Sequence, residues 1–153
     1  MKNYKSLLII LTFFSFLGCE KKVDLGAHDV HWDRDMCIRC KMVVSERQYA
    51  AQTTNPITGR TYYFDDIGCL VLWFEEDEIE WADKAVVWVM DVKTGEWINA
   101  REAKWSTVSI TPMAFGFSAY KAGTEPKNEE IIDYDEMVKR SIALEARKKG
   151  IGK

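Results

Sequence analysis

The sequence lacks the features of several common classes of protein. It has no excess of positive charge, because 21 Lys and Arg stand against 24 Asp and Glu for a formal net charge of −3. Nucleic-acid binding needs clustered Lys and Arg against phosphates, so nucleic acid is not an expected partner. No Ser-His-Asp set, catalytic carboxylate pair or phosphate-binding glycine loop can be assigned in the 153 residues, so no enzymatic activity is implied.

The chain also lacks an apolar run long enough to span a bilayer, which takes about 20 residues. The run "LLIILTFFSFL" at 7–17 follows Lys2 and Lys5 and precedes Gly18 and Cys19, an arrangement typical of a secretory signal. "FLGC" resembles a bacterial lipobox. We therefore expect residues 1–18 to be a lipoprotein signal peptide and Cys19 to be lipidated, which anchors the chain to a bacterial membrane, facing the periplasm or exterior. The alternative is a simple signal peptide that leaves Cys19 as a free thiol, an unusual group in an oxidising compartment.

The expected mature chain is a mildly acidic domain of modest size. Removal of residues 1–18 takes away two lysines, which leaves 135 residues with a net charge of −5. This length suffices for one compact unit, or for two very small ones that share a core. Residues 19–35 are polar and have no hydrophobic period, so we expect a flexible tether.

The first unit is expected over residues 36–92. Two β-prone segments, 49–54 and 61–65, flank the turn-rich "NPITGR" and predict a hairpin. Asp65 or Asp66 can cap a following helix, whose apolar residues fall at helical spacing on one stripe: Ile67, Leu70, Val71 and Phe74. Residues 85–91 are apolar on both faces, which is typical of a central strand. The order is therefore β-β-α-β.

The second unit, over residues 93–150, repeats this order more loosely. Segments 97–100, 104–109 and 115–120 are strand-like, and a final helix is expected from Asp133 or Asp135 to Gly150. The predicted fold class is α+β, with two small ββαβ-type halves packed together.

A dense group of sulfur atoms lies at the start of the first unit. "MCIRCKM", residues 36–42, contains Cys37, Cys40 and two methionines. If residues 40–42 are extended, Cys40 and Met42 point to the same side, and Cys37 can fold over through a turn. Thiolate and thioether form a soft donor set that favours Cu(I). With Cys19 lipidated, three cysteines remain, and an odd number leaves at least one thiol for another use such as metal binding.

Other interpretations of these residues stay open. The CxxC pair is also compatible with a thiol-disulfide oxidoreductase or with a zinc-stabilised structural domain. Cys69 is either a small buried hydrophobe, a disulfide partner or an auxiliary ligand. His28 and His31 of the tether are possible auxiliary ligands, and Met36 is expected to pack or to face solvent. Met113, on a loop after Pro112, is a candidate to complete the coordination of copper.

Three stretches together resemble the NosL family of bacterial lipoproteins. They are "CIRCKMVVSERQYAAQ", "YYFDDIGCLVLWFEE" and "TPMAFGFSAY", in this order, within a similarity that covers residues 36–145. The resemblance implies a copper chaperone that holds Cu(I) outside the cytoplasm and supplies it for the copper centres of nitrous oxide reductase, in contact with that enzyme or its assembly and transport machinery. It also implies a pair of ββαβ units related to a domain of organomercurial lyase.

The resemblance also assigns candidate ligands. By position, the Cys-x-Met ligands of the family fall on Cys40 and Met42. The methionine of a "PMG"-like segment falls on Met113, where Ala114 replaces the usual glycine. Cys37 is not required by the family motif; it would tighten the site, or pair with Cys40 when the metal is absent.

Overall fold

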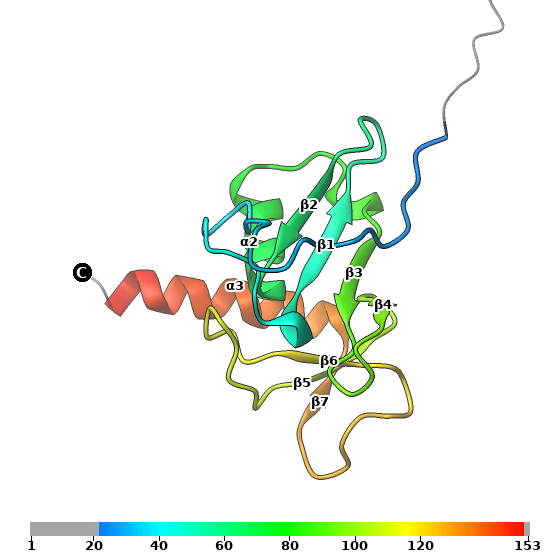
Figure 1. The fold of residues 1–153 in the computed structure, drawn as a ribbon. Helices are drawn as coiled ribbons and strands as arrows, with labels where there is room; N and C mark the ends of the chain where they lie inside the picture. The colour runs from blue at the N-terminus through cyan, green and yellow to red at the C-terminus, as the bar shows by residue number, and fades with distance from the viewer. Residues whose placement is uncertain (1–21, 152–153) are drawn as a thin grey trace, which may run out of the picture.

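Two antiparallel sheets and two α-helices make up residues 22–151, the part of the chain that the computed structural model describes (Figure 1). The expected signal peptide and Cys19 lie outside this range. Within it, no helix has both the length and the apolar character needed to cross a membrane. The α+β class expected from the sequence is confirmed.

The first sheet has the strand order β2-β1-β3-β4. Its strands are β1 (Ala51–Thr54), β2 (Thr61–Phe64), β3 (Val87–Met90) and β4 (Trp97–Asn99), and every neighbouring pair is antiparallel. Helix α2 (Ile67–Glu76) lies between β2 and β3 in the sequence, so the predicted β-β-α-β order is present. The sequence assigned residues 97–100 to the second unit, whereas β4 pairs with β3 and extends the first sheet.

Helix α2 lies against one face of this sheet and is buried over its first seven residues. All seven residues from Ile67 to Trp73 are buried, because the sheet covers one side of the helix and α3 covers another. On the sheet, Tyr62 and Phe64 alternate with Tyr63 and pack on the Trp73 ring, with centroid distances of 4.7 and 5.5 Å. The helix is therefore a central element, and its first turn is held firmly.

Residues 22–35 cover the other face of the sheet, and we call this segment the strap. The Gln52 side chain and the His28 backbone exchange two hydrogen bonds, of 2.8 and 2.9 Å. The Trp88 indole donates to the Leu25 carbonyl at 2.8 Å, and the Tyr63 hydroxyl donates to the Asp29 carbonyl at 3.1 Å. Figure 1 shows the strap, in blue, crossing β1. The expectation of a flexible tether is therefore wrong for residues 22–35, because side chains of three strands bind their backbone.

The second sheet is smaller and precedes its helix. It has the order β6-β5-β7, from β5 (Lys104–Ser106), β6 (Ser118–Tyr120) and β7 (Ile131–Ile132). Helix α3 (Tyr134–Ile151) follows, and the Asp133 carboxylate accepts a hydrogen bond from the Glu136 amide at its start. The second half is thus β-β-β-α rather than ββαβ, and its strands are shorter than expected. Two 3-10 turns, η2 (Arg47–Tyr49) and η3 (Ala82–Lys84), complete the elements.

The two halves share one hydrophobic core, and the start of α2 is a main point of contact. A Cβ placed on Gly68 would lie 2.2 Å from the Phe115 ring, so only glycine lets the loop between β5 and β6 pack on the helix here. The Thr111 hydroxyl of the same loop donates to the Asp66 carboxylate at 2.6 Å. The second half therefore holds the N-terminus of α2 in place.

Candidate metal centre

The CxxC motif lies on a tight turn. The Cys37 amide donates to the Met42 carbonyl at 2.8 Å, and the Lys41 amide donates to the Cys37 carbonyl at 3.0 Å. Lys41 has a φ of +63°, a left-handed conformation. The expectation that residues 40–42 are extended is wrong, because the chain reverses at Lys41. Cys40 and Met42 are therefore not neighbours on one face of a strand.

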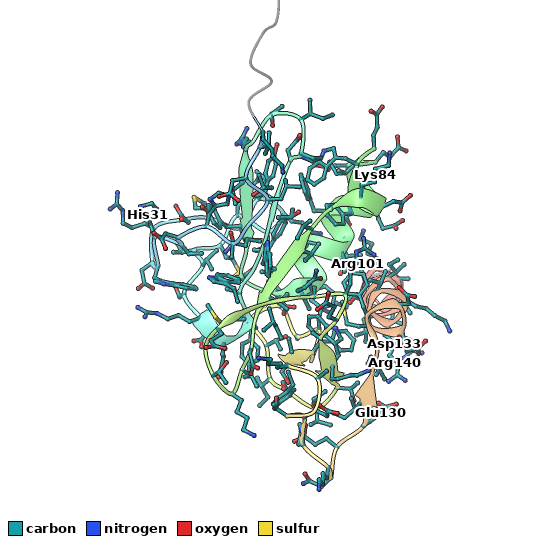
Figure 2. The ribbon with its side chains drawn as sticks, turned by 90° about the vertical axis from the view of Figure 1, so that its right-hand side faces the viewer. His31, Lys84, Arg101, Glu130, Asp133 and Arg140 are labelled. Atoms are coloured by element: carbon teal, nitrogen blue, oxygen red, sulfur yellow. The ribbon has the colours of Figure 1, made fainter. Side chains whose placement is uncertain are left out.

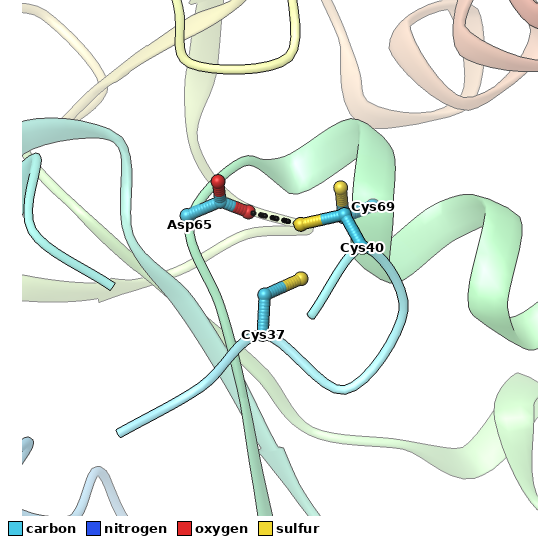
Figure 3. A group of neighbouring side chains, drawn as sticks. All are labelled: Cys37, Cys40, Asp65 and Cys69. Carbon is cyan, nitrogen blue, oxygen red and sulfur yellow. Dashed lines mark hydrogen bonds between the residues drawn. The ribbon is translucent and has the colours of Figure 1, made fainter. Parts of the chain in front are cut away.

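This turn places its two cysteines beside the beginning of α2. The Ile38 amide donates to the Tyr63 carbonyl at 3.1 Å, which docks the turn against the end of β2. Cys69 lies in the first turn of α2, and Asp65 lies between β2 and the helix. The three sulfur atoms and a carboxylate oxygen, from Cys37, Cys40, Cys69 and Asp65, all lie within 4.8 Å of one another. Figure 3 shows these side chains converging from three segments of the chain.

The cluster is buried, apart from one partly accessible thiol. Cys37, Cys69 and Asp65 are buried, and Cys40 is half-buried. No two of these cysteines form a disulfide. The Cys40 thiol donates to Asp65 Oδ1 at 3.4 Å, whereas Asp65 Oδ2 has no hydrogen-bond partner. A buried carboxylate oxygen without a partner is costly, so this group has an unmet need for a cation or a donor.

The two adjacent aspartates have different tasks. Asp66 is the N-cap of α2: its carboxylate accepts hydrogen bonds from the Gly68 amide, the Thr111 hydroxyl and the Met113 amide. Burial raises the pKa of Asp66, and these three hydrogen bonds oppose that rise. Asp65, which the sequence offered only as an alternative cap, joins the cysteines instead. The sequence did offer a signal for this role of Asp65. Only one of two adjacent aspartates before a helix can occupy the N-cap position, so the other is free to join a site.

The three thiols titrate as a group. A hydrogen bond with the Cys69 thiol lowers the pKa of Cys37 to about 6, although burial opposes this. Burial raises the pKa of Cys40 to about 12, and the hydrogen bond with Cys37 raises the pKa of Cys69. The first proton leaves easily, and the thiolate that remains makes loss of the next ones harder. A bound cation would reverse that penalty, because it neutralises the accumulating charge.

Arg39, between the two cysteines of the motif, fastens the turn to both helices. Its guanidinium donates two hydrogen bonds to Glu76 of α2, at 2.8 and 3.0 Å, and one to Glu145 of α3 at 2.9 Å. Its hydrogen bonds lower the pKa of Glu76 to about 2. The turn is therefore preorganised, with little freedom to move away from Cys69.

The three methionines of the sequence hypothesis differ in their exposure to solvent. Met42 is 49% exposed and lies across the turn from Cys37, to which its carbonyl is hydrogen-bonded. Met36, which was expected to pack or to face solvent, is 53% exposed. Met113 is half-buried, and its backbone is held by Asp66 and by the Lys148 ammonium, which donates to its carbonyl at 2.8 Å. Its loop is thus tied to the residue that follows Asp65.

Neither histidine of the strap belongs to the cluster found among the described residues. His28 faces the Asp24 carbonyl, 3.4 Å from its Nε2. His31 is exposed, pairs with Asp35 and points away from the body of the domain (Figure 2).

The fold is similar to that of a solved structure. The structure matches the crystal structure of the copper chaperone NosL from Shewanella denitrificans with a TM-score of 0.61 and 14% sequence identity, over 74% of this chain and 96% of that chain. No family model matches the sequence, and a search of curated proteins found no match. The NosL-like fold expected from the sequence resemblance is therefore confirmed, at a sequence identity that shows the fold alone.

Proposed function

We propose that this chain is an extracytoplasmic, lipid-anchored copper chaperone that holds Cu(I) at the cluster of Cys37, Cys40 and Cys69. In this proposal Met42 and Met113 supply thioethers at the edge of the site. The delivery of copper for the maturation of nitrous oxide reductase is part of the proposal, and it rests on the family resemblance of the three sequence stretches.

The convergence of three thiols and a buried carboxylate carries this proposal. Thiolates are soft ligands, and two from the CxxC turn and one from α2, all within 4.8 Å, form a donor set that Cu(I) prefers. The first turn of α2 adds a favourable field, because Cys69 lies close to the positive end of the helix dipole. The NosL-like fold supports the choice of copper.

The burial pattern fits a site that receives and releases its ion from one side. Cys40 is the only cluster thiol that is not fully buried, and the half-exposed Met42 lies on the same turn. An incoming ligand from an acceptor protein would reach the ion at this side first. Exchange of Cys40 and a thioether for acceptor ligands then moves the copper without releasing it into solvent.

A structural zinc site is the second candidate, and Asp65 is the observation that favours it. Three cysteines and a carboxylate make four donors, the number that a closed tetrahedral zinc site requires. The enzyme alternative, a thiol-disulfide oxidoreductase, is less well supported. Its attacking thiol needs access, whereas Cys37, the cluster thiol with the lowered pKa, is buried.

Anaerobic metal competition separates these functions. We expect the chain to bind a single Cu(I), to retain it against excess Zn(II), and to stay folded when the copper is removed by a chelator. Stoichiometric zinc after anaerobic purification, with unfolding upon chelation, would replace the chaperone with the structural zinc site. Reduction of a disulfide substrate by the reduced chain, unaffected by replacement of Met42, would favour the oxidoreductase.

Delivery needs a separate measurement. Chain loaded with Cu(I) is mixed with copper-free nitrous oxide reductase, and the absorption of the copper centres is followed. Copper transfer that is faster from the loaded chain than from an equal amount of chelated Cu(I) supports this acceptor. Equal rates would contradict it while leaving copper binding itself intact.

A further inference from the structure

The strap determines where the N-terminal end of the chain leaves the domain. The Leu25 carbonyl is fixed by the Trp88 indole, and the Val23 side chain lies beside Gly59, whose Cβ position would be 3.7 Å from Val23 Cγ1. Gly59 belongs to the turn between β1 and β2, at the top of Figure 1. The chain therefore enters the fold beside this turn.

The expected lipid attachment site is only four residues before Val23. Four residues of fully extended chain span roughly 14 Å at most. A lipid on Cys19 would therefore hold the β1–β2 turn close to the bilayer, whatever the conformation of the intervening residues.

The turn itself presents an apolar side chain on a rigid frame. The Asn55 side-chain oxygen accepts hydrogen bonds from the amides of Ile57 and Thr58, at 2.8 and 3.0 Å. Ile57 at its tip is 79% exposed. Arg60 is the only charged residue in the turn, and it too is exposed. At the boundary between headgroups and acyl chains, an exposed aliphatic side chain can insert while an arginine keeps its charged end at the headgroups.

We propose that residues 55–60 form a membrane-contacting surface, with Ile57 inserted into the bilayer interface and Arg60 facing lipid phosphates. The proposal rests on the lipid anchor of the proposed function and goes beyond it by assigning an orientation. Asp65 of the metal cluster follows the other end of β2, about 13 Å along the strand from the end that joins this turn. The partly accessible Cys40 thus lies clear of the bilayer, where an acceptor can reach it from the aqueous side.

Insertion, rather than net charge, is the main source of this contact. Figure 2 shows Lys84 at the same end of the molecule as the turn, but Asp83 beside it is also exposed and carries the opposite charge. We therefore expect similar contact with vesicles of phosphatidylcholine and with vesicles that contain phosphatidylglycerol.

Ile110 provides a matched control. It is an isoleucine on a loop of the second sheet, 93% exposed, and that sheet lies at the opposite end of Figure 1. A photo-cross-linking amino acid is placed at position 57 or at position 110 of the full-length chain, which is processed in a bacterial host and reconstituted into vesicles of each composition. Neither replacement touches the metal cluster. The Cys19→Ser variant of each gives the baseline without a lipid anchor.

Cross-linking to lipid is expected to be about tenfold or more stronger from position 57 than from position 110. Burial of an aliphatic side chain of this size in an apolar environment is favourable by an amount that corresponds to such a factor. Vesicle association with equal cross-linking from both positions would overturn the orientation alone. Absence of vesicle association in the processed chain would overturn the anchor and this proposal together. Cu(I) binding, measured separately by chelator competition, reports on the chaperone function independently of these results.

Discussion

Replacement of Cys69 by alanine tests whether the three thiols act as one metal site. The family resemblance assigns no ligand role to this residue, and its buried position on α2 fits equally well with simple packing. The structure, however, puts its sulfur within 4.8 Å of the ligand atoms of Cys37, Cys40 and Asp65. If these groups share one ion, the loss of Cys69 must weaken binding strongly.

The size of this effect can be worked from the number of donors. Structural Zn²⁺ sites with four ligands bind their metal with an apparent free energy of about 10–16 kcal/mol, and we take this scale for Cu(I) as well. An equal share for each ligand is about 2.5–4 kcal/mol, so the Cys69→Ala variant should bind Cu(I) roughly 10²–10³-fold more weakly. The loss of one buried sulfur costs the metal-free fold only about 1 kcal/mol, so the variant should still fold.

The assay is anaerobic competition for Cu(I) against a chromogenic chelator, with urea unfolding of the metal-free protein in parallel. Met137→Leu is the matched control, since Met137 is a fully buried sulfur of α3 that accepts from the Ser141 hydroxyl at 3.6 Å. That control should change stability slightly and leave the Cu(I) affinity unchanged. A folded Cys69→Ala variant with the affinity of the parent would refute the shared site and leave Cys40 with the thioethers as the ligands.

Four further predictions follow from the same contacts. Asp65→Asn should raise the free energy of unfolding of the metal-free protein, measured in urea, by about 1–2 kcal/mol, because one oxygen of the buried carboxylate has no partner. The same variant should weaken the binding of Zn(II) more than that of Cu(I), and equal losses of affinity for the two ions would contradict this. Gly68→Ala should destabilise the fold by about 1–3 kcal/mol through its clash with Phe115, and Phe115→Ala should relieve part of that cost, so additive effects in a double-mutant cycle would count against the clash. Met42→Leu should weaken Cu(I) binding about tenfold or more, whereas Met36→Leu, at a comparably exposed methionine on the same turn, should leave it unchanged, and equal behaviour of the two would remove Met42 from the site. Because the pKa of Glu76 is lowered to about 2, the contribution of its ion pair to stability is fully present above its unfolded pKa of about 4.3 and is lost as the pH falls through 2; Glu76→Gln should therefore cost about 1 kcal/mol or less at pH 7 and progressively less as the pH falls through 2, and a cost that does not shrink in acid would argue against the ion pair with Arg39.

Local patterns in the sequence were sufficient to predict most elements of the first half of the fold. The hairpin around "NPITGR", the capped helix 67–76 and the central strand 87–90 each depend on neighbouring residues, so turn chemistry, capping and hydrophobic period predict them. The second half was less predictable. β7 has only two residues, too short for a period, and β4 joins the first sheet because β3 offers it an unpaired edge.

The strap shows a different limit of sequence reasoning. Its residues are polar and aperiodic, which by composition favours a flexible segment. It is ordered because its backbone carbonyls and amides find donors and acceptors on Gln52, Trp88 and Tyr63, three side chains that share one face of the sheet. Only the strand register brings these three together, and no local pattern encodes it.

For the candidate site too, part could be predicted from the sequence and part depended on the tertiary structure. The sequence by itself supplied the soft donors of residues 36–42, which favour a soft metal ion, because the chemistry of thiols and thioethers belongs to the side chains. Tertiary structure decided which donors meet. Lys41 turns the chain, so that Cys40 and Met42 do not align as on a strand, and the docking of that turn on β2 brings it to Asp65 and Cys69. Asp65 and Cys69 lie more than 20 residues further along the chain. They join the cluster only because the end of β2 and the first turn of α2 lie beside the CxxC turn.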